Sequence, residues 1–229
     1  MLATVQYGPR ERKVIQSVPT SGQVVVDYRM GQFAPAQQLV PLNLVSTGSD
    51  YTARIGRKIM ITDFLFRYTL GFPIPSGTGS FNDPLPTLVR VMLVYDKAPV
   101  GANQPLLGDV LDTNMSCTNS SGTVHYIMAG NNLNFRTRFV TLYDKVHNMG
   151  FCYNGSTGLS PTQIGGMGGG CYQVYIKKKL PAIFSGSGNT WEAIREGAIL
   201  LLAISNKDNG GFTDCPSMNI SYRFRFTDD

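Results

Sequence analysis

Residues 88–113, LVRVMLVYDKAPVGANQPLLGDVLDT, decide the fold. The run 88–95 is β-branched and aliphatic, too short to cross a membrane and too rich in strand-forming residues for a helix. We therefore expect a buried strand. Residues 98–101 then turn the chain, and Pro105 opens a single helical turn around residues 107–111.

Seven further segments have the pattern of strands, and no long amphipathic helix accompanies them. They are residues 24–28, 38–45, 59–70, 135–143, 171–179, 198–205 and 218–227. The apolar run 198–205 predicts a second fully buried strand, and Pro41 predicts an edge or strand-end position for 38–45. About eight strands without a repeat period are typical of an all-β sandwich.

The segment 59–70 changes its alternation in the middle. Ile59 and Ile61 share one parity, whereas Phe64, Phe66 and the later apolar residues share the other. Such a change turns every following side chain to the opposite face of the sheet unless one extra residue is absorbed. We therefore predict a β-bulge near residues 62–63.

Composition favours one domain and a polyanionic partner. The 229 residues include 25 Gly and 13 Pro spread along the chain, which suits short strands joined by turns. The formal charge of +5 favours polyanions, and a basic protein without such a partner is the alternative. We assign residues 1–37 to an N-terminal arm or first strand and residues 38–229 to the main domain.

Groups suited to catalysis or metal binding are sparse. The two histidines, His125 and His147, have no metal-ligand spacing, and we expect both in loops or at the surface. A dyad of Cys152 with His147 is the nucleophilic arrangement that the sequence leaves open. The four cysteines include no CxxC pair, so we expect free thiols. The glycine-rich run 164–170 precedes a strand pattern rather than Lys-Ser/Thr and a helix, so we expect a flexible connection. The sequence thus predicts no enzyme, no metal and no cofactor.

Six features follow one another in the order found in the coat proteins of geminiviruses and related small circular single-stranded-DNA viruses, and the chain resembles that family. The features are the basic pair 57–58 before a long strand, the strand, turn and helical turn carrying Asp96, Lys97, Pro99, Gly108, Asp109, Val110 and Leu111, residues 138–142 before Asp144 and Lys145, the lysines 177–179, the apolar run 198–205, and the alternating aromatic and basic end 222–229.

This resemblance covers residues 38–229 and implies a fold, a partner and a location. The implied fold is a single-domain, eight-stranded jelly roll of the viral capsid type. The implied function is self-assembly into a small icosahedral (T=1) shell that encloses a single-stranded DNA genome, without membrane insertion. The protein would be found in the virion and, during assembly, in the host nucleus.

Alternation within three strands, combined with the resemblance, predicts a basic face for the genome. Arg223 and Arg225 oppose the aromatic residues of the last strand, and the same parity argument applies to Lys177, Lys179 and Arg90. The resemblance implies that these strands share one sheet, which faces the capsid interior. The candidate phosphate contacts are Arg10, Arg12, Lys13, Arg90, Lys177, Lys179, Arg223 and Arg225, with Tyr175 available for base stacking.

The family also has a long Arg/Lys-rich N-terminal arm, and only Arg10, Arg12 and Lys13 resemble its end here. Loops 71–86, 114–122 and 151–170 are expected at the outer surface and subunit junctions. Two other functions are a jelly-roll carbohydrate-binding module and a cupin-type enzyme. A basic sheet face that is merely solvated is the plainest alternative to a nucleic-acid site.

Overall fold

The computed structural model describes residues 12–17, 24–25, 39–71, 87–99, 103–112, 114, 117–118, 124–149, 170–206 and 216–228. Three predicted features lie wholly or largely outside these residues. They are Arg10, the glycine-rich run 164–170 apart from Gly170, and most of the loops expected at the outer surface.

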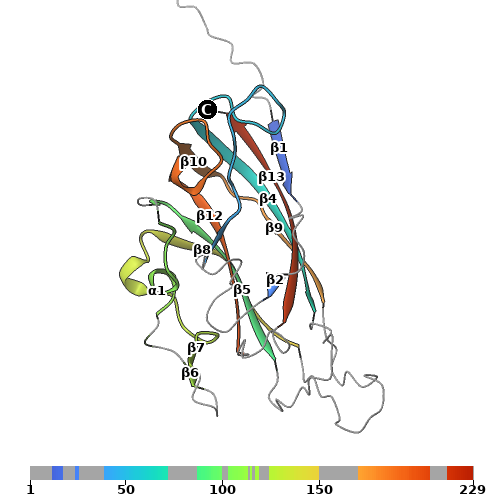
Figure 1. The fold of residues 1–229 in the computed structure, drawn as a ribbon, viewed down its shortest axis with the longest axis vertical. Helices are drawn as coiled ribbons and strands as arrows, with labels where there is room; N and C mark the ends of the chain where they lie inside the picture. The colour runs from blue at the N-terminus through green and yellow to red at the C-terminus, as the bar shows by residue number, and fades with distance from the viewer. Residues whose placement is uncertain are drawn as a thin grey trace, which may run out of the picture.

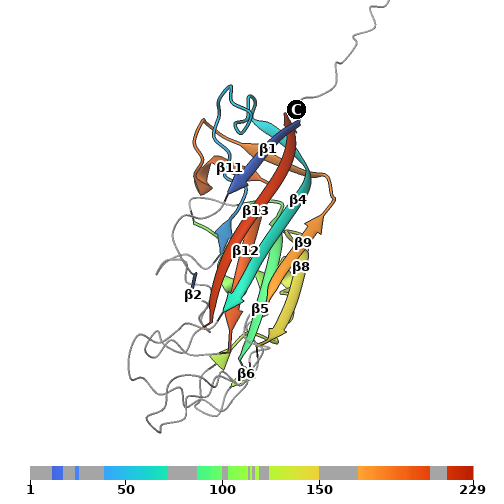
Figure 2. The ribbon, with the colours of Figure 1, turned by 90° about the vertical axis from the view of Figure 1, so that its right-hand side faces the viewer.

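The described chain is an all-β sandwich of two antiparallel sheets, as the sequence predicts (Figures 1 and 2). The larger sheet has the order β1 (Arg12–Ser17), β13 (Ser217–Asp228), β4 (Lys58–Gly71), β10 (Leu180–Phe184), β11 (Ile194–Glu196), with β2 (Val24–Val25) on β13 and β9 (Cys171–Ile176) on β4. The smaller sheet has the order β3 (Val40–Pro41), β12 (Ala198–Ser205), β5 (Leu88–Asp96), β8 (Phe139–Asn148).

Short elements complete the described structure. The strands β6 (Cys117–Thr118) and β7 (Val124–His125) form a separate pair. One helical turn, α1 (Leu107–Val110), follows β5 as predicted, and two 3-10 turns occupy η2 (Leu133–Phe135) and η3 (Trp191–Ala193). The confirmed edge position of Pro41 on β3 fits its missing N–H.

The two apolar runs form the centre of the smaller sheet. β5 and β12 pair along their whole length, from Ala198 opposite Asp96 to Ser205 opposite Val89. Every residue of β12, and every residue of β5 after Leu88, is buried. Both strands therefore lack the alternation of a half-exposed strand, because both of their faces are covered.

The predicted bulge in β4 is confirmed. Arg225 lies opposite Asp63, but the next residue of β13, Phe226, lies opposite Ile61. Thr62 is therefore the extra residue, and its hydroxyl donates to the carbonyl oxygen of Arg225 at 3.3 Å. The bulge keeps the apolar residues of β4 on either side of it buried between the sheets.

Several predicted strands differ from those of the structure: the segment 38–45 forms a strand only at Val40–Pro41, and the segment 171–179 only at Cys171–Ile176. The strand predicted at 135–143 begins only at Phe139, because the side chain of Asn132 caps the turn η2 by accepting from the Asn134 N–H at 3.0 Å. The sequence reading also missed β1, whose six residues pair with β13 from Arg12 opposite Thr227 onward. The larger sheet thus includes residues 12–17, which lie within the range 1–37 assigned to an N-terminal arm or first strand.

A buried aromatic cluster joins the two sheets near β8 and β9. The Tyr68 hydroxyl lies 2.7 Å from His147 Nε2 and 2.8 Å from the Tyr143 hydroxyl oxygen. The rings of His147 and Tyr172 are 4.1 Å apart between centroids. His147 is 5% exposed, so its expected surface position is wrong. Its proposed dyad partner, Cys152, lies outside the described residues, as does the side chain of His125.

Acid should weaken the fold through His147. Burial, reinforced by nearby Lys145, lowers the pKa of His147 from 6.5 to about 4, so the unfolded chain binds the proton more readily. Stability should therefore fall as the pH drops from about 6.5 to about 4, by up to roughly 3 kcal/mol. Urea unfolding of wild type and His147→Gln across this range measures the effect. The variant should have a flatter pH dependence; identical pH profiles would contradict this role of His147.

Candidate nucleic-acid interface

The outer face of the larger sheet is defined by the alternation of β13 and β4. Phe224 and Phe226 of β13 are fully buried between the sheets, whereas Arg223 and Arg225 have the opposite parity and are partly exposed. On β4 the outward residues opposite these two arginines are Leu65 and Asp63. The prediction that both arginines turn away from the core is thus confirmed.

Strand β9 extends this face on the far side of β4. Tyr175 lies opposite Leu65, and its side chain is 56% exposed. Lys177 and Lys179 are exposed in the short connection between β9 and β10. The structure therefore brings Tyr175 and Arg223 to either side of one residue, Leu65, and places the lysines just beyond the end of β9.

Lys13 is not available for phosphate contact. It lies opposite Phe226 in β1, so its side chain points inward and is only 2% exposed. Its ammonium donates to the Ala53 carbonyl at 2.9 Å and pairs with Asp228 at 3.0 Å. Its neighbour Arg12 has the outward parity and is exposed at the edge of the sheet.

Arg90 was assigned to the wrong sheet. β5 belongs to the smaller sheet, and Arg90 is 6% exposed there. Its guanidinium donates to both carboxylate oxygens of Asp144, at 2.8 and 2.7 Å, and to the carbonyls of Ile127 and Ala129. Arg90 therefore connects β5 to β8 and to residues 127–129 by hydrogen bonds. It cannot contact nucleic acid without breaking these hydrogen bonds.

Arg67 is the residue of this face that the sequence reading missed. It is exposed on β4, opposite Ser221 of β13 and Gln173 of β9, and its Nε donates to the Gln173 side-chain oxygen at 2.9 Å. The parity of Phe64 and Phe66 predicts that Arg67 points outward. A single arginine in the segment 59–70, however, does not by itself indicate a binding site.

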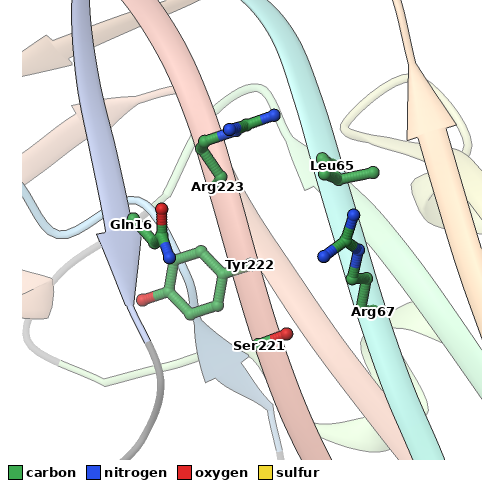
Figure 3. Close-up of a pocket in the computed structure, with 6 residues that line it drawn as sticks. All are labelled: Gln16, Leu65, Arg67, Ser221, Tyr222 and Arg223. Atoms are coloured by element: carbon green, nitrogen blue, oxygen red, sulfur yellow. The ribbon is translucent and has the colours of Figure 1, made fainter.

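A hollow of about 110 Å³ lies over β1, β13 and β4 beside Arg67 and Arg223. Figure 3 shows Arg223 reaching from β13 toward β4, where Leu65 and Arg67 lie. The lining residues are Gln16, Leu65, Arg67, Ser221, Tyr222 and Arg223. The hollow thus combines two guanidinium groups with hydroxyl and amide groups that can also bind an anion.

The cations of the sandwich differ in their partners. Lys13, Arg90 and Arg138 are held by Asp228, Asp144 and Asp96 at 2.7–3.0 Å. Arg225 has only a loose pair with Asp63, at 3.8 Å. Within the described residues, no carboxylate pairs with Arg67 or Arg223. Among the described residues, these two side chains on neighbouring strands therefore carry positive charge that no carboxylate pairs with.

The described residues contain no cluster of three or more His, Cys, Asp or Glu side chains arranged to hold a metal ion. In that same part of the chain, no helix has the length and apolar character needed to cross a membrane. No protein-family model and no curated protein sequence matches this chain.

Proposed function

We propose that this protein is a capsid protein that assembles with itself into a small icosahedral shell around a single-stranded DNA genome. The strand order is the observation that carries the proposal. When β9 and β10 are counted as one strand and the short strands β2, β6, β7 and β11 are set aside, the larger sheet has the order first, eighth, third, sixth. The smaller sheet then has the order second, seventh, fourth, fifth. We infer from this order the two interlocked Greek keys of a jelly roll, an architecture common in viral capsids.

The charge of the outer face favours a polyanionic partner among the functions that a jelly roll supports. Lectin and carbohydrate-binding domains share this architecture, but they use exposed aromatic rings to bind sugars. Here the aromatic rings of β4 and the Phe rings of β13 are buried between the sheets, while arginines occupy the exposed parity. Tyr175 is an exposed ring on this face, and it lies among these cations.

Exposed apolar side chains elsewhere supply candidate contacts between copies. Leu106, Met128 and Leu133 are 60–72% exposed, and all three lie in the segments around α1 and η2. The two segments are joined by the Asn132 N–H, which donates to the Val110 carbonyl at 2.9 Å. Modest contacts of this kind become stable in a closed shell because many of them form together.

Neutralising the outer face should release nucleic acid from the purified particle. The variant replaces Lys177, Lys179, Arg223 and Arg225 with Gln, which removes positive charge from exposed or partly exposed positions and leaves the buried core unchanged. We expect the nuclease-protected absorbance at 260 nm to fall while the melting temperature stays near that of wild type, because the four residues contribute charge rather than packing.

The matched control removes the same charge from exposed cations outside the strands of this face, at Arg57, Lys97, Arg136 and Lys145. This control should retain its nucleic acid. Equal retention by both variants would contradict the assignment of the basic face, and equal loss would mean that only net charge matters.

A further inference from the structure

We propose that Arg67 and Arg223 form a discrete phosphate-binding site, and that Tyr175 and Leu65 beside it receive a base of the same single strand. This inference rests on the proposed function, because it names the part of the basic face that holds the genome. It adds Arg67, which sequence alone did not select. It also assigns phosphate binding to two specific arginines rather than to the overall positive charge of the sheet.

Register brings the two arginines together. Arg223 lies opposite Leu65, and Arg67 is two residues further along β4, so the two arginines are diagonal neighbours on one face. Such neighbours lie about 7–8 Å apart at the backbone, which long side chains can bridge. Both arginines line the same hollow of about 110 Å³ (Figure 3).

Two guanidinium groups at this separation repel each other unless an anion lies between them. Lys13, Arg90 and Arg138 have close carboxylate partners and Arg225 has a loose one, whereas no carboxylate pairs with Arg67 or Arg223 in the described part of the chain. Arg67 is nevertheless held in place, because Gln173 accepts from its Nε at 2.9 Å, and no described residue accepts from its two terminal nitrogens, which can therefore bind a ligand. A phosphate group fits this arrangement, since planar guanidinium groups bind its oxygens in pairs.

The neighbouring surface distinguishes a nucleic-acid strand from a small anion. Leu65 separates Arg223 on β13 from Tyr175 on β9, so the backbones of Arg223 and Tyr175 lie about 10 Å apart, two strand spacings, and both side chains are on the same face. An aromatic ring beside a phosphate site is the arrangement with which proteins bind single strands regardless of sequence. Paired bases are stacked inside a duplex and cannot reach such a ring, so the site should prefer single strands.

The test measures binding of a fluorescent oligo-dT of about 20 nucleotides to the full chain by anisotropy at several salt concentrations. The Arg67→Gln/Arg223→Gln variant should bind at least tenfold more weakly, and the slope of log affinity against log salt should decrease by about 1.4 for two lost phosphate contacts. The control Lys97→Gln/Arg136→Gln loses the same charge from exposed positions on the side of the smaller sheet and should bind within about twofold of wild type.

Two further variants separate the parts of the site. Arg67→Lys/Arg223→Lys keeps the charge but loses the paired geometry, so it should bind more weakly with an unchanged salt slope. Tyr175→Ala should weaken oligo-dT about tenfold and leave competition by inorganic pyrophosphate unchanged. If Tyr175→Ala has no effect and pyrophosphate displaces the oligonucleotide completely, the site holds a small anion and the proposal is overturned.

The proposal and the capsid function can fail separately. If the protein forms shells but the two-arginine variant binds oligo-dT as tightly as its control, the site is wrong and the capsid function stands. If the protein stays monomeric but the variant loses binding as described, the site stands on a nucleic-acid-binding domain that does not form shells.

Discussion

The substitution Gly197→Ala should prevent folded protein from accumulating, whereas Gly186→Ala should leave the protein folded and only slightly less stable. Both glycines have nearly the same backbone conformation, with φ of +76° and +75°. This left-handed conformation alone costs an alanine about 1–2 kcal/mol. The two sites differ in what a methyl group would meet.

At Gly197 the methyl group would overlap the carbonyl group of Pro181 and lie 2.9 Å from the Ala182 Cα. The surrounding backbone is held on several sides. Pro181 and Ala182 pair with β4, the Tyr95 hydroxyl donates to the Pro181 carbonyl at 2.6 Å, and Asn43 donates to the Gly197 carbonyl at 2.8 Å. Relief therefore requires a shift of paired strands, and we expect a total cost above about 4 kcal/mol.

At Gly186 no atom lies within 4 Å of the added methyl group, so only the conformational cost applies. Soluble yield and urea unfolding of the two variants measure the difference. Equal losses of stability would show that the close approach of residue 197 to β10 is not a constraint of the fold.

The substitution Arg90→Met should cost about 2–4 kcal/mol, because it leaves the buried carbonyl groups of Ile127 and Ala129 without their donor and breaks the pair with the partly exposed carboxylate of Asp144. A methionine side chain fills much of the same space. The loss of stability should therefore come mainly from the lost hydrogen bonds and only slightly from a cavity. The matched comparison is Arg225→Met, whose ion pair with Asp63 is long and whose side chain is 39% exposed. An exposed pair of this kind contributes at most about 1 kcal/mol.

Chemical denaturation of both variants measures the two costs. If Arg90→Met lowers the free energy of unfolding no more than Arg225→Met does, the four hydrogen bonds of Arg90 do not stabilise the fold as proposed.

The local sequence pattern was enough to predict a strand and its side-chain directions wherever each face of the strand is either wholly buried or wholly exposed. The apolar runs of β5 and β12 identified the central strands, and the parity change around Thr62 located the bulge in β4. On the candidate site, the alternation of the last strand placed Arg223 and Arg225 outward, and the alternation of β9 placed Tyr175 there. In each case neighbouring residues alone determine which way the side chain points.

The errors arose where partners distant in sequence decide the outcome. The parity of β5 could not tell where Arg90 points, because both faces of that strand are buried and the covering residues 127–129 are far along the chain. Lys13 points inward, where it forms an ion pair with Asp228 from the other end of the chain. His147 is buried by Tyr68 of the opposite sheet, 79 residues away. Arg67 becomes a candidate site residue only through the register between β4 and β13, which places Arg223 beside it.

The mass of the purified particle tests the central proposal most directly. A T=1 shell contains about 60 copies, so the chain of 25.0 kDa should sediment as one uniform species of roughly 1.5 MDa at moderate salt. Light scattering coupled to size exclusion gives that mass without assuming a shape. A closed, uniform particle near this mass is the result we predict. A species that remains at 25.0 kDa across protein and salt concentrations would contradict the capsid function and favour a monomeric binding domain.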